Sequence, residues 1–122
     1  YKKNIFEYII QFDSFILTSR YEGMPYVLFE AMYLGVPVIA NKVGGIDNVL
    51  TDHVNSLLTE VDSPVSSADA IIEMADKVEL RNDLKNNSFE LIENLNVIKM
   101  SQETSLFLIE QLKLENKIKL HY

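Results

Sequence analysis

Residues 13–40, DSFILTSRYEGMPYVLFEAMYLGVPVIA, form the stretch that decides the fold. Two short apolar runs, at 15–18 and 36–40, are continuous rather than alternating, which is typical of strands that are covered on both faces. Between them, Gly23 lies in a polar loop, Pro25 suits the first position of a helix, and Gly35 suits its stop. The stretch therefore predicts a strand, a loop, a helix over 25–34 and a second strand.

The flanking sequence continues this alternation. Apolar spacing predicts a helix over 4–12. After the second strand we expect a turn at Gly44-Gly45, one helical turn over 46–50, and a weaker strand over 56–59. A further helix is predicted to begin with Ser63 as cap and Pro64 at its first position. Its expected apolar face consists of Ala68, Ile71, Ile72 and Ala75.

Two more helices are predicted, over 79–94 and 99–117. Short apolar strands that alternate with helices indicate a parallel sheet with both faces covered. The predicted fold class is therefore α/β, a three-layer α/β/α Rossmann-like arrangement with about three strands plus helices.

Composition excludes several classes of site and partner. The chain has 122 residues, about one domain, and its 11 Lys and Arg against 18 Asp and Glu give a net charge of −7. We expect no nucleic-acid partner, because phosphate neutralisation needs a basic surface. Cysteine is absent, and His53 and His121 lie far apart, so no metal site is expected. No apolar run reaches the roughly 18 residues that span a bilayer.

Two carboxylates mark the candidate site. Glu22 lies in the loop, and Glu30 lies in the helix after Pro25, a rise of roughly 7–8 Å along the axis. We expect about 10 Å or more between the carboxylates, which exceeds the spacing of a glycosidase pair and suits two points on one elongated ligand. Because its helix is otherwise apolar, Glu30 is expected to be largely buried and to need a partner. In the plainer alternative, Glu30 is an exposed helix residue and Gly23 and Pro25 only build a turn.

Four motifs occur together and in order. They are EGMP at 22–25, EAM at 30–32 with its Glu eight positions after Glu22, GVPVIA at 35–40, and the glycine pair at 44–45. In this combination the chain resembles the family 4 retaining glycosyltransferases of the GT-B fold. The resemblance covers about residues 4–95 and rests mostly on 13–60.

The resemblance implies a domain that binds a nucleotide-sugar donor. Glu22 would be the catalytic residue, in contact with the donor sugar near the reacting carbon, and Glu30 would accept hydrogen bonds from the ribose hydroxyls. Backbone groups that would hold sugar hydroxyls and phosphate belong to Gly23, Met24, Tyr26 and Val27. Transfer would retain the anomeric configuration, with front-face departure of the nucleoside diphosphate and with no metal or other cofactor.

The chain also departs from the family pattern. Asp47 and Asn48 replace the usual Pro and Glu after the glycine pair, so that turn receives no firm role, and Ser56 stands where Gly is usual. The family's basic pair, its glycine-rich loop and its N-terminal acceptor domain have no counterpart here, although Arg20 is a candidate for phosphate contact. We therefore expect residues 1–122 to be the C-terminal half of the nucleotide-binding domain, with donor-site segment 13–60 and closing helices 64–120, inactive alone.

The remaining expectations concern partners and alternatives. The acceptor, a glycan or a lipid-linked glycan, is unknown. The exposed edge of strand 15–18 predicts a homo-oligomer. We expect a cytoplasmic protein and a surface position for His53. The basic end at Lys113, Lys117 and Lys119 is expected to be a terminal helix that packs on the parent enzyme; peripheral contact with an anionic membrane at its inner face is the alternative. A non-catalytic nucleotide- or sugar-binding module is the alternative; a phosphoacceptor receiver domain is disfavoured because the strands do not end in the acidic residues it needs.

Overall fold

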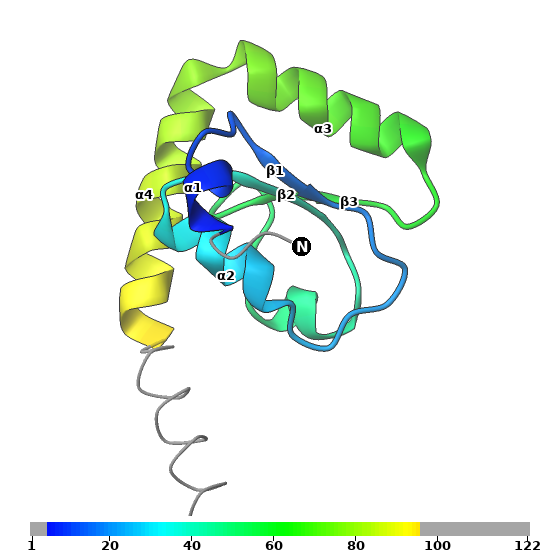
Figure 1. Ribbon diagram of the computed structural model, residues 1–122. Helices are drawn as coiled ribbons and strands as arrows, with labels where there is room; N and C mark the ends of the chain where they lie inside the picture. The colour runs from blue at the N-terminus through cyan, green and yellow to red at the C-terminus, as the bar shows by residue number, and fades with distance from the viewer. Residues whose placement is uncertain (1–4, 96–122) are drawn as a thin grey trace, which may run out of the picture. The chain divides into compact units, whose positions relative to one another are not determined.

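The computed structural model describes residues 5–95 (Figure 1). The chain divides into two compact units, Tyr1–Ile92 and Glu93–Tyr122. In chain order the described elements are α1 (Phe6–Ile9), β1 (Phe15–Leu17), α2 (Tyr26–Tyr33), β2 (Val38–Asn41), the 3-10 helix η1 (Gly44–Asn48), β3 (Leu57–Thr59), α3 (Pro64–Asp76) and α4 (Val78–Leu95).

The strands form one parallel, 3-stranded sheet in the order β1-β2-β3. Phe15 pairs with Val38, and Ile39 pairs with Leu57. The central strand, β2, is buried along its whole length. It has a strand on each side and helices over each face, which explains why its sequence shows no polar alternation. The predicted parallel α/β sheet is confirmed.

Helices cover both faces of this sheet (Figure 1). α2 packs against β1 and β2, and α3 packs against β2 and β3 from the opposite side. On the α3 side, Ile39 and Leu57 form a buried cluster with Ala70, Met74 and Leu84. Burying one large aliphatic side chain is worth about 1.5–3 kcal/mol, so this cluster holds α3 and the first half of α4 on the sheet.

Several predicted boundaries were too wide. The helix expected over 4–12 is the single turn α1 within the described residues. The second strand begins at Val38 rather than at 36, because Pro37 has no N–H; its carbonyl accepts from the Phe15 N–H at 2.9 Å. Pro25 is the cap of α2 rather than its first helical residue, with extended φ −76° and ψ 103°.

The predicted ends of α2 and α3 are otherwise confirmed. Gly35 follows α2 with φ +72°, a left-handed conformation that ends a helix at little cost for glycine. Ser63 caps α3, since its side chain accepts from the Ser66 N–H at 3.2 Å, and Pro64 is the first helical residue. Both signals are local, so the sequence alone carries them.

The predicted apolar face of α3 was wrong. The helix buries Ala70 and Met74, while Ile71 and Ile72 are exposed. Ala68 and Ala75 are exposed as well. Both stripes obey helical spacing, so periodicity cannot choose between them. The sheet decides which stripe is buried, because Ala70 and Met74 pack against Ile39 and Leu57.

Some predictions lie outside the described residues. These include the helix over 99–117, the basic end at Lys113, Lys117 and Lys119, and most of the closing segment beyond α4. Over residues 5–95, no helix combines the length and the apolar character that crossing a membrane requires.

Candidate functional site

The candidate site lies where β1 ends and α2 begins. The loop 18–25 connects these two elements, so it leaves the carboxyl end of a parallel strand, where open α/β sheets bind ligands. Glu22 and Gly23 lie in the loop, Met24 is exposed there, and Tyr26 and Val27 open the helix. The structure thus gathers five of the six predicted site residues into one loop and one helical turn.

Several backbone N–H groups of this segment are unsatisfied. Within residues 5–95, none of the N–H groups of Gly23, Met24, Tyr26 and Val27 donates to a protein acceptor. The first intrahelical bond runs from the Leu28 N–H to the Pro25 carbonyl, at 3.1 Å. Free donors at a helix start attract phosphate and hydroxyl oxygens, so the loop can hold an oxygen-rich ligand.

The Glu22 carboxylate is held in place by a local contact. Ser19 Oγ donates to Glu22 Oε1 at 2.6 Å. Within residues 5–95, Glu22 Oε2 carries no hydrogen bond or ion pair. Glu22 is partly buried, so one oxygen is fixed by the protein while the other can receive a ligand hydroxyl.

Glu30 lies one turn further along α2. It is partly buried and shares the outward stripe with Tyr26 and Tyr33, which are 65% and 57% exposed. The described part of the chain gives its carboxylate no hydrogen bond or ion pair. Glu30 is thus only partly buried rather than largely buried as expected, because only the inward side of α2 is covered. A carboxylate on a half-exposed stripe is free to bind a ligand.

The glycine pair has a structural role that the sequence did not reveal. Gly44 has φ +42°, and a Cβ there would lie 2.7 Å from the Glu22 carbonyl oxygen. A Cβ on Gly45 would overlap the Gly23 carbonyl oxygen. The Gly45 N–H also donates to the Glu22 carbonyl at 3.3 Å. Both glycines are needed because η1 packs directly on the backbone of the site loop.

Two buried polar side chains lie behind the loop and were also missed. Asn41, at the end of β2, donates from Nδ2 to the Ser19 carbonyl at 3.1 Å. Thr59, at the end of β3, donates from Oγ1 to Asn41 Oδ1 at 2.8 Å. Strand register brings these residues together, since Asn41 pairs with Thr59.

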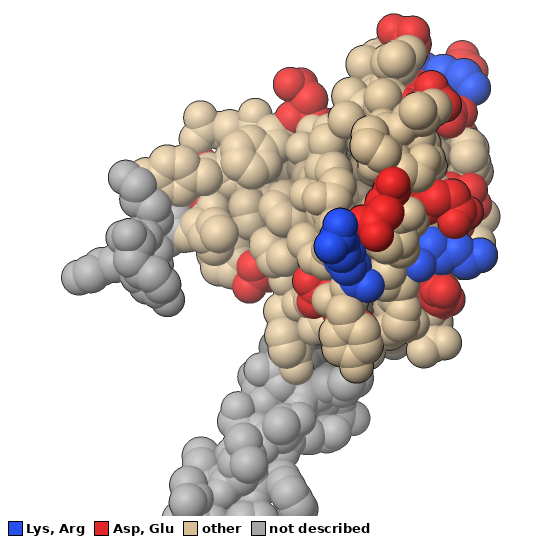
Figure 2. Space-filling model, turned by 90° about the vertical axis from the view of Figure 1, so that its right-hand side faces the viewer, with Lys and Arg blue, Asp and Glu red and all other residues tan. Residues whose placement is uncertain are grey.

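Arg20, a candidate for phosphate contact, forms an ion pair with Asp62. Its Nε donates to Asp62 Oδ1 at 2.6 Å, in the turn before α3. The side chains are 79% and 60% exposed, so the pair is a solvent-screened contact. On the face in Figure 2, acidic and basic side chains are interspersed and no basic patch forms.

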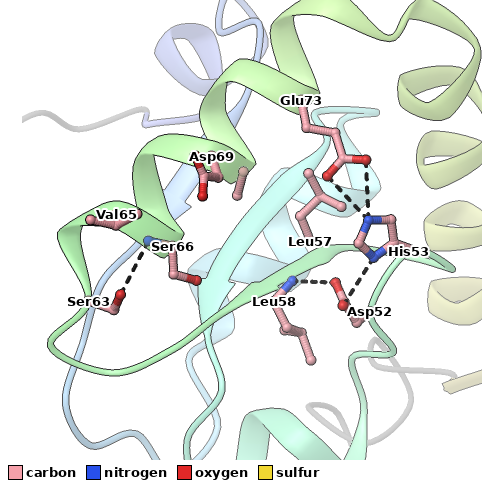
Figure 3. Close-up of a pocket in the computed structure, with 10 residues that line it drawn as sticks. Asp52, His53, Leu57, Leu58, Ser63, Val65, Ser66, Asp69 and Glu73 are labelled. Carbon is pink, nitrogen blue, oxygen red and sulfur yellow. Dashed lines mark hydrogen bonds and ion pairs between the residues drawn. The ribbon is translucent and has the colours of Figure 1, made fainter.

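A shallow pocket of about 370 Å³ lies between β3 and α3, and none of the predicted site residues lines it (Figure 3). At its rim, the His53 ring contacts Asp52 at 3.0 Å and Glu73 at 3.2 Å. Partial burial opposes the charged form of His53, but these two carboxylates outweigh it and raise its pKa above the ordinary 6.5. The predicted surface position of His53 is confirmed, whereas its link to α3 was not foreseen.

Comparison with protein families gives one match that covers most of the chain. The family model described as "Glycosyl transferases group 1" matches residues 1–91. An N-acetyl-alpha-D-glucosaminyl L-malate synthase from Bacillus anthracis is 33% identical over 89 residues, which is 73% of this chain and 23% of that protein. A Vi polysaccharide biosynthesis protein from Salmonella typhi is 39% identical over 64 residues, 52% of this chain and 11% of that protein. The chain thus spans less than a quarter of these relatives.

A solved structure has the same fold. The Anabaena protein HepE, crystallised in complex with UDP and glucose, superposes with a TM-score of 0.75 over 85% of this chain and 29% of its own. The sequence identity is 24%, so this likeness bears on the fold alone.

Proposed function

This chain belongs to the glycosyl transferases group 1 family, and on that premise we propose that it forms part of the donor-binding domain of a sugar-transferring enzyme. The carrying observation is the loop between β1 and α2, which presents unsatisfied N–H groups beside a fixed carboxylate. Because the chain spans less than a quarter of its relatives, the activity belongs to a longer protein in this proposal.

The proposed donor is a nucleotide-sugar. Glu22 contacts the sugar near the reacting carbon through its free oxygen and stabilises the positive charge that develops there. The backbone N–H groups of Gly23, Met24, Tyr26 and Val27 bind phosphate and sugar hydroxyls. Glu30 accepts hydrogen bonds from the ribose. This ligand class is proposed from the membership of the chain in its family.

The proposed reaction transfers the sugar with retention of configuration. The nucleoside diphosphate leaves from the same face of the sugar that the acceptor approaches, and Glu22 assists by charge stabilisation. No metal ion is required in this proposal. A polysaccharide or glycoconjugate pathway fits the names of the relatives from Salmonella typhi and Bacillus anthracis.

The remaining proposals concern partners and location. The acceptor is a glycan or a lipid-linked glycan, bound by an N-terminal domain outside this sequence, and residues 1–122 form the C-terminal half of the nucleotide-binding domain. The protein acts in the cytoplasm, at the inner face of the membrane. Copies of the isolated chain associate through the free edge of β1.

The alternative is a module that binds a nucleotide or sugar without turnover. The test compares Glu22→Ala and Glu30→Gln in the full-length protein that carries this sequence, with UDP- and GDP-sugars as donors. Glu22→Ala should lower kcat about 100-fold or more while leaving nucleoside diphosphate binding within a few-fold. Glu30→Gln should weaken nucleotide binding about 10-fold, the size of one charged hydrogen bond.

Glu90→Gln is the matched control, because Glu90 is an exposed glutamate on α4. It should change neither quantity. Donor binding without any turnover in the unmodified protein would favour the binding module. Unchanged turnover in Glu22→Ala would remove Glu22 from the proposed mechanism.

A further inference from the structure

A relay of hydrogen bonds runs across the carboxyl ends of all the described strands and terminates on Glu22. Thr59 Oγ1 donates to Asn41 Oδ1 at 2.8 Å, Asn41 Nδ2 donates to the Ser19 carbonyl at 3.1 Å, and Ser19 Oγ donates to Glu22 Oε1 at 2.6 Å. The relay connects the end of β3 through β2 to the loop after β1. No local sequence motif contains these four residues together.

The direction of each bond follows from the chemistry of its ends. The Ser19 carbonyl can only accept, so the Asn41 amide must present Nδ2 to it and Oδ1 to Thr59. Asn41 Oδ1 can only accept in turn, so the Thr59 hydroxyl must donate. The Ala40 carbonyl is a second acceptor for this hydroxyl at 3.3 Å, and the shorter contact is the one to Asn41. Exchanging N and O of the amide would break its bond to the Ser19 carbonyl, because two oxygens would then face each other.

Burial makes this arrangement rigid. Asn41 is 4% exposed and Thr59 is 3% exposed, so water cannot readily replace a lost partner. An unpaired buried amide is costly, which disfavours any rotation of the Asn41 side chain. Ser19 is only partly buried, so the relay leads from the dry sheet to the solvent-accessible loop.

The same loop is held from its other side by η1. The Gly45 N–H donates to the Glu22 carbonyl, and the glycine pair leaves no gap against the backbone of Glu22 and Gly23. The backbone of Glu22 is therefore fixed by η1. Its carboxylate is fixed by Ser19, whose own backbone carbonyl is fixed by Asn41.

We propose that Ser19, Asn41 and Thr59 are positioning residues that hold one carboxylate oxygen of Glu22 so that the other faces the donor sugar. This inference rests on the proposed function of Glu22. None of the three needs to touch the substrate. Their effect is on turnover rather than on donor affinity, because a displaced carboxylate loses charge stabilisation in the transition state while the N–H groups still bind the donor.

The test uses Thr59→Val and Thr59→Ser in the full-length protein. Valine keeps the shape of threonine without the hydroxyl, whereas serine keeps the hydroxyl. Thr59→Val should lower kcat about 10-fold, with the KM for the nucleotide-sugar within about twofold, and Thr59→Ser should restore most of the loss. Thr51→Val is the matched control. Thr51 is exposed, and its backbone N–H, which valine keeps, donates to Asn55 Oδ1, so kcat should not change.

Ser19→Ala is the second variant, since it removes the contact to Glu22 at the partly exposed end of the relay. It should reproduce the loss of kcat with an unchanged melting temperature. In a Glu22→Ala background, neither Thr59→Val nor Ser19→Ala should lower turnover further, because the group they position is gone. The side-chain amide protons of Asn41 should exchange faster in Thr59→Val, which NMR of the same protein measures directly.

Different failures have different signatures. Equal losses in kcat and in donor affinity, or a further loss in the Glu22→Ala background, would make the relay a purely structural feature and overturn the inference. Unchanged kcat in both Thr59→Val and Ser19→Ala would also overturn it. Unchanged turnover in Glu22→Ala alone would instead refute the proposed function of Glu22, whatever the relay variants do.

Discussion

Gly45 is the residue at which packing leaves no room for a side chain. Because a Cβ there would overlap the Gly23 carbonyl oxygen, Gly45→Ala must displace η1 or the site loop. We expect a loss of about 1–3 kcal/mol in the free energy of unfolding, typical of overpacking. Urea unfolding measures it.

Gly23→Ala is the matched control for this prediction. A Cβ at Gly23 meets nothing within 4 Å, and its φ is not left-handed. Alanine should therefore leave stability unchanged or raise it by about 0.4–1 kcal/mol through the unfolded state. Equal losses of unfolding free energy in the two variants would show that the contact between the glycine pair and the loop does not cause the destabilisation.

Ser56 and Ser88 are two fully buried serines, of which only Ser88 has a hydrogen-bonded hydroxyl in the described part of the chain. Among residues 5–95 the Ser56 hydroxyl has no hydrogen-bond partner, whereas Ser88 Oγ donates to the Asn55 carbonyl at 2.7 Å. Ser56→Ala should be neutral or stabilise by about 1 kcal/mol, because it removes an unsatisfied group. Ser88→Ala should cost about 1–3 kcal/mol, because it leaves the buried Asn55 carbonyl without this donor. Thermal unfolding of the two variants side by side distinguishes them; a large loss in Ser56→Ala would contradict the prediction.

Among the helices and strands, the sequence predicted the features that depend only on residues close together in the chain. The cap at Ser63, the stop at Gly35 and the continuous apolar run of β2 all act within a few residues, so the sequence is sufficient for them. The apolar face of α3 was wrong because two stripes had the same period and only the sheet could choose.

The same distinction applies to the candidate site. The loop with Glu22 and the helix with Glu30 follow from the spacing of the motif. Apart from the local bond from Ser19 to Glu22, the contacts behind this loop do not, because Asn41 and Thr59 meet through strand register, and the glycine pair meets the loop through the turn after β2. These contacts join residues that are far apart in the chain. No periodicity within one element encodes them.

His53 connects the turn before β3 to α3 and makes this connection sensitive to pH. Since Asp52 and Glu73 raise the folded-state pKa of His53 above 6.5, its stabilising contribution is complete below pH 6.5 and is lost as the pH rises through that raised value. The unfolding free energy of the unmodified chain should therefore fall across this window relative to His53→Gln.

The expected size of this effect is small. The His53 side chain is 53% exposed, and exposed pairs contribute less than about 1 kcal/mol. Urea midpoints on either side of the window, at low and high salt, provide the measurement. High salt should flatten the difference between the two proteins. A difference that instead grows as the pH rises would contradict the sign derived from the two carboxylates.

At the scale of the whole sheet, β1 and β3 are the two outer strands among the described residues, and β1 is the one that lies beside exposed apolar side chains. The strand order places β1 at the end of the sheet, with β2 on one side only. Ile16 is 39% exposed on this strand, and Ile10 and Phe12 are exposed just before it. An open strand edge beside apolar side chains is a template for pairing with another chain.

We therefore predict that the isolated chain self-associates through β1. Sedimentation equilibrium from micromolar to millimolar concentration should show dimers or larger species, and Ile16→Lys should shift the population toward monomer, because a charge at a strand edge opposes pairing. Ile72→Lys is the matched control, since Ile72 is an exposed apolar residue on α3, away from the edge.

A different result is expected in the full-length protein. If a further strand of the same domain pairs with β1 there, Ile16→Lys should lower stability instead of changing the association state, because Ile16 would then be covered within one molecule. A monomeric isolated chain at millimolar concentration would contradict the association outright. Equal dissociation by Ile72→Lys would place the contact on α3 rather than on the strand edge.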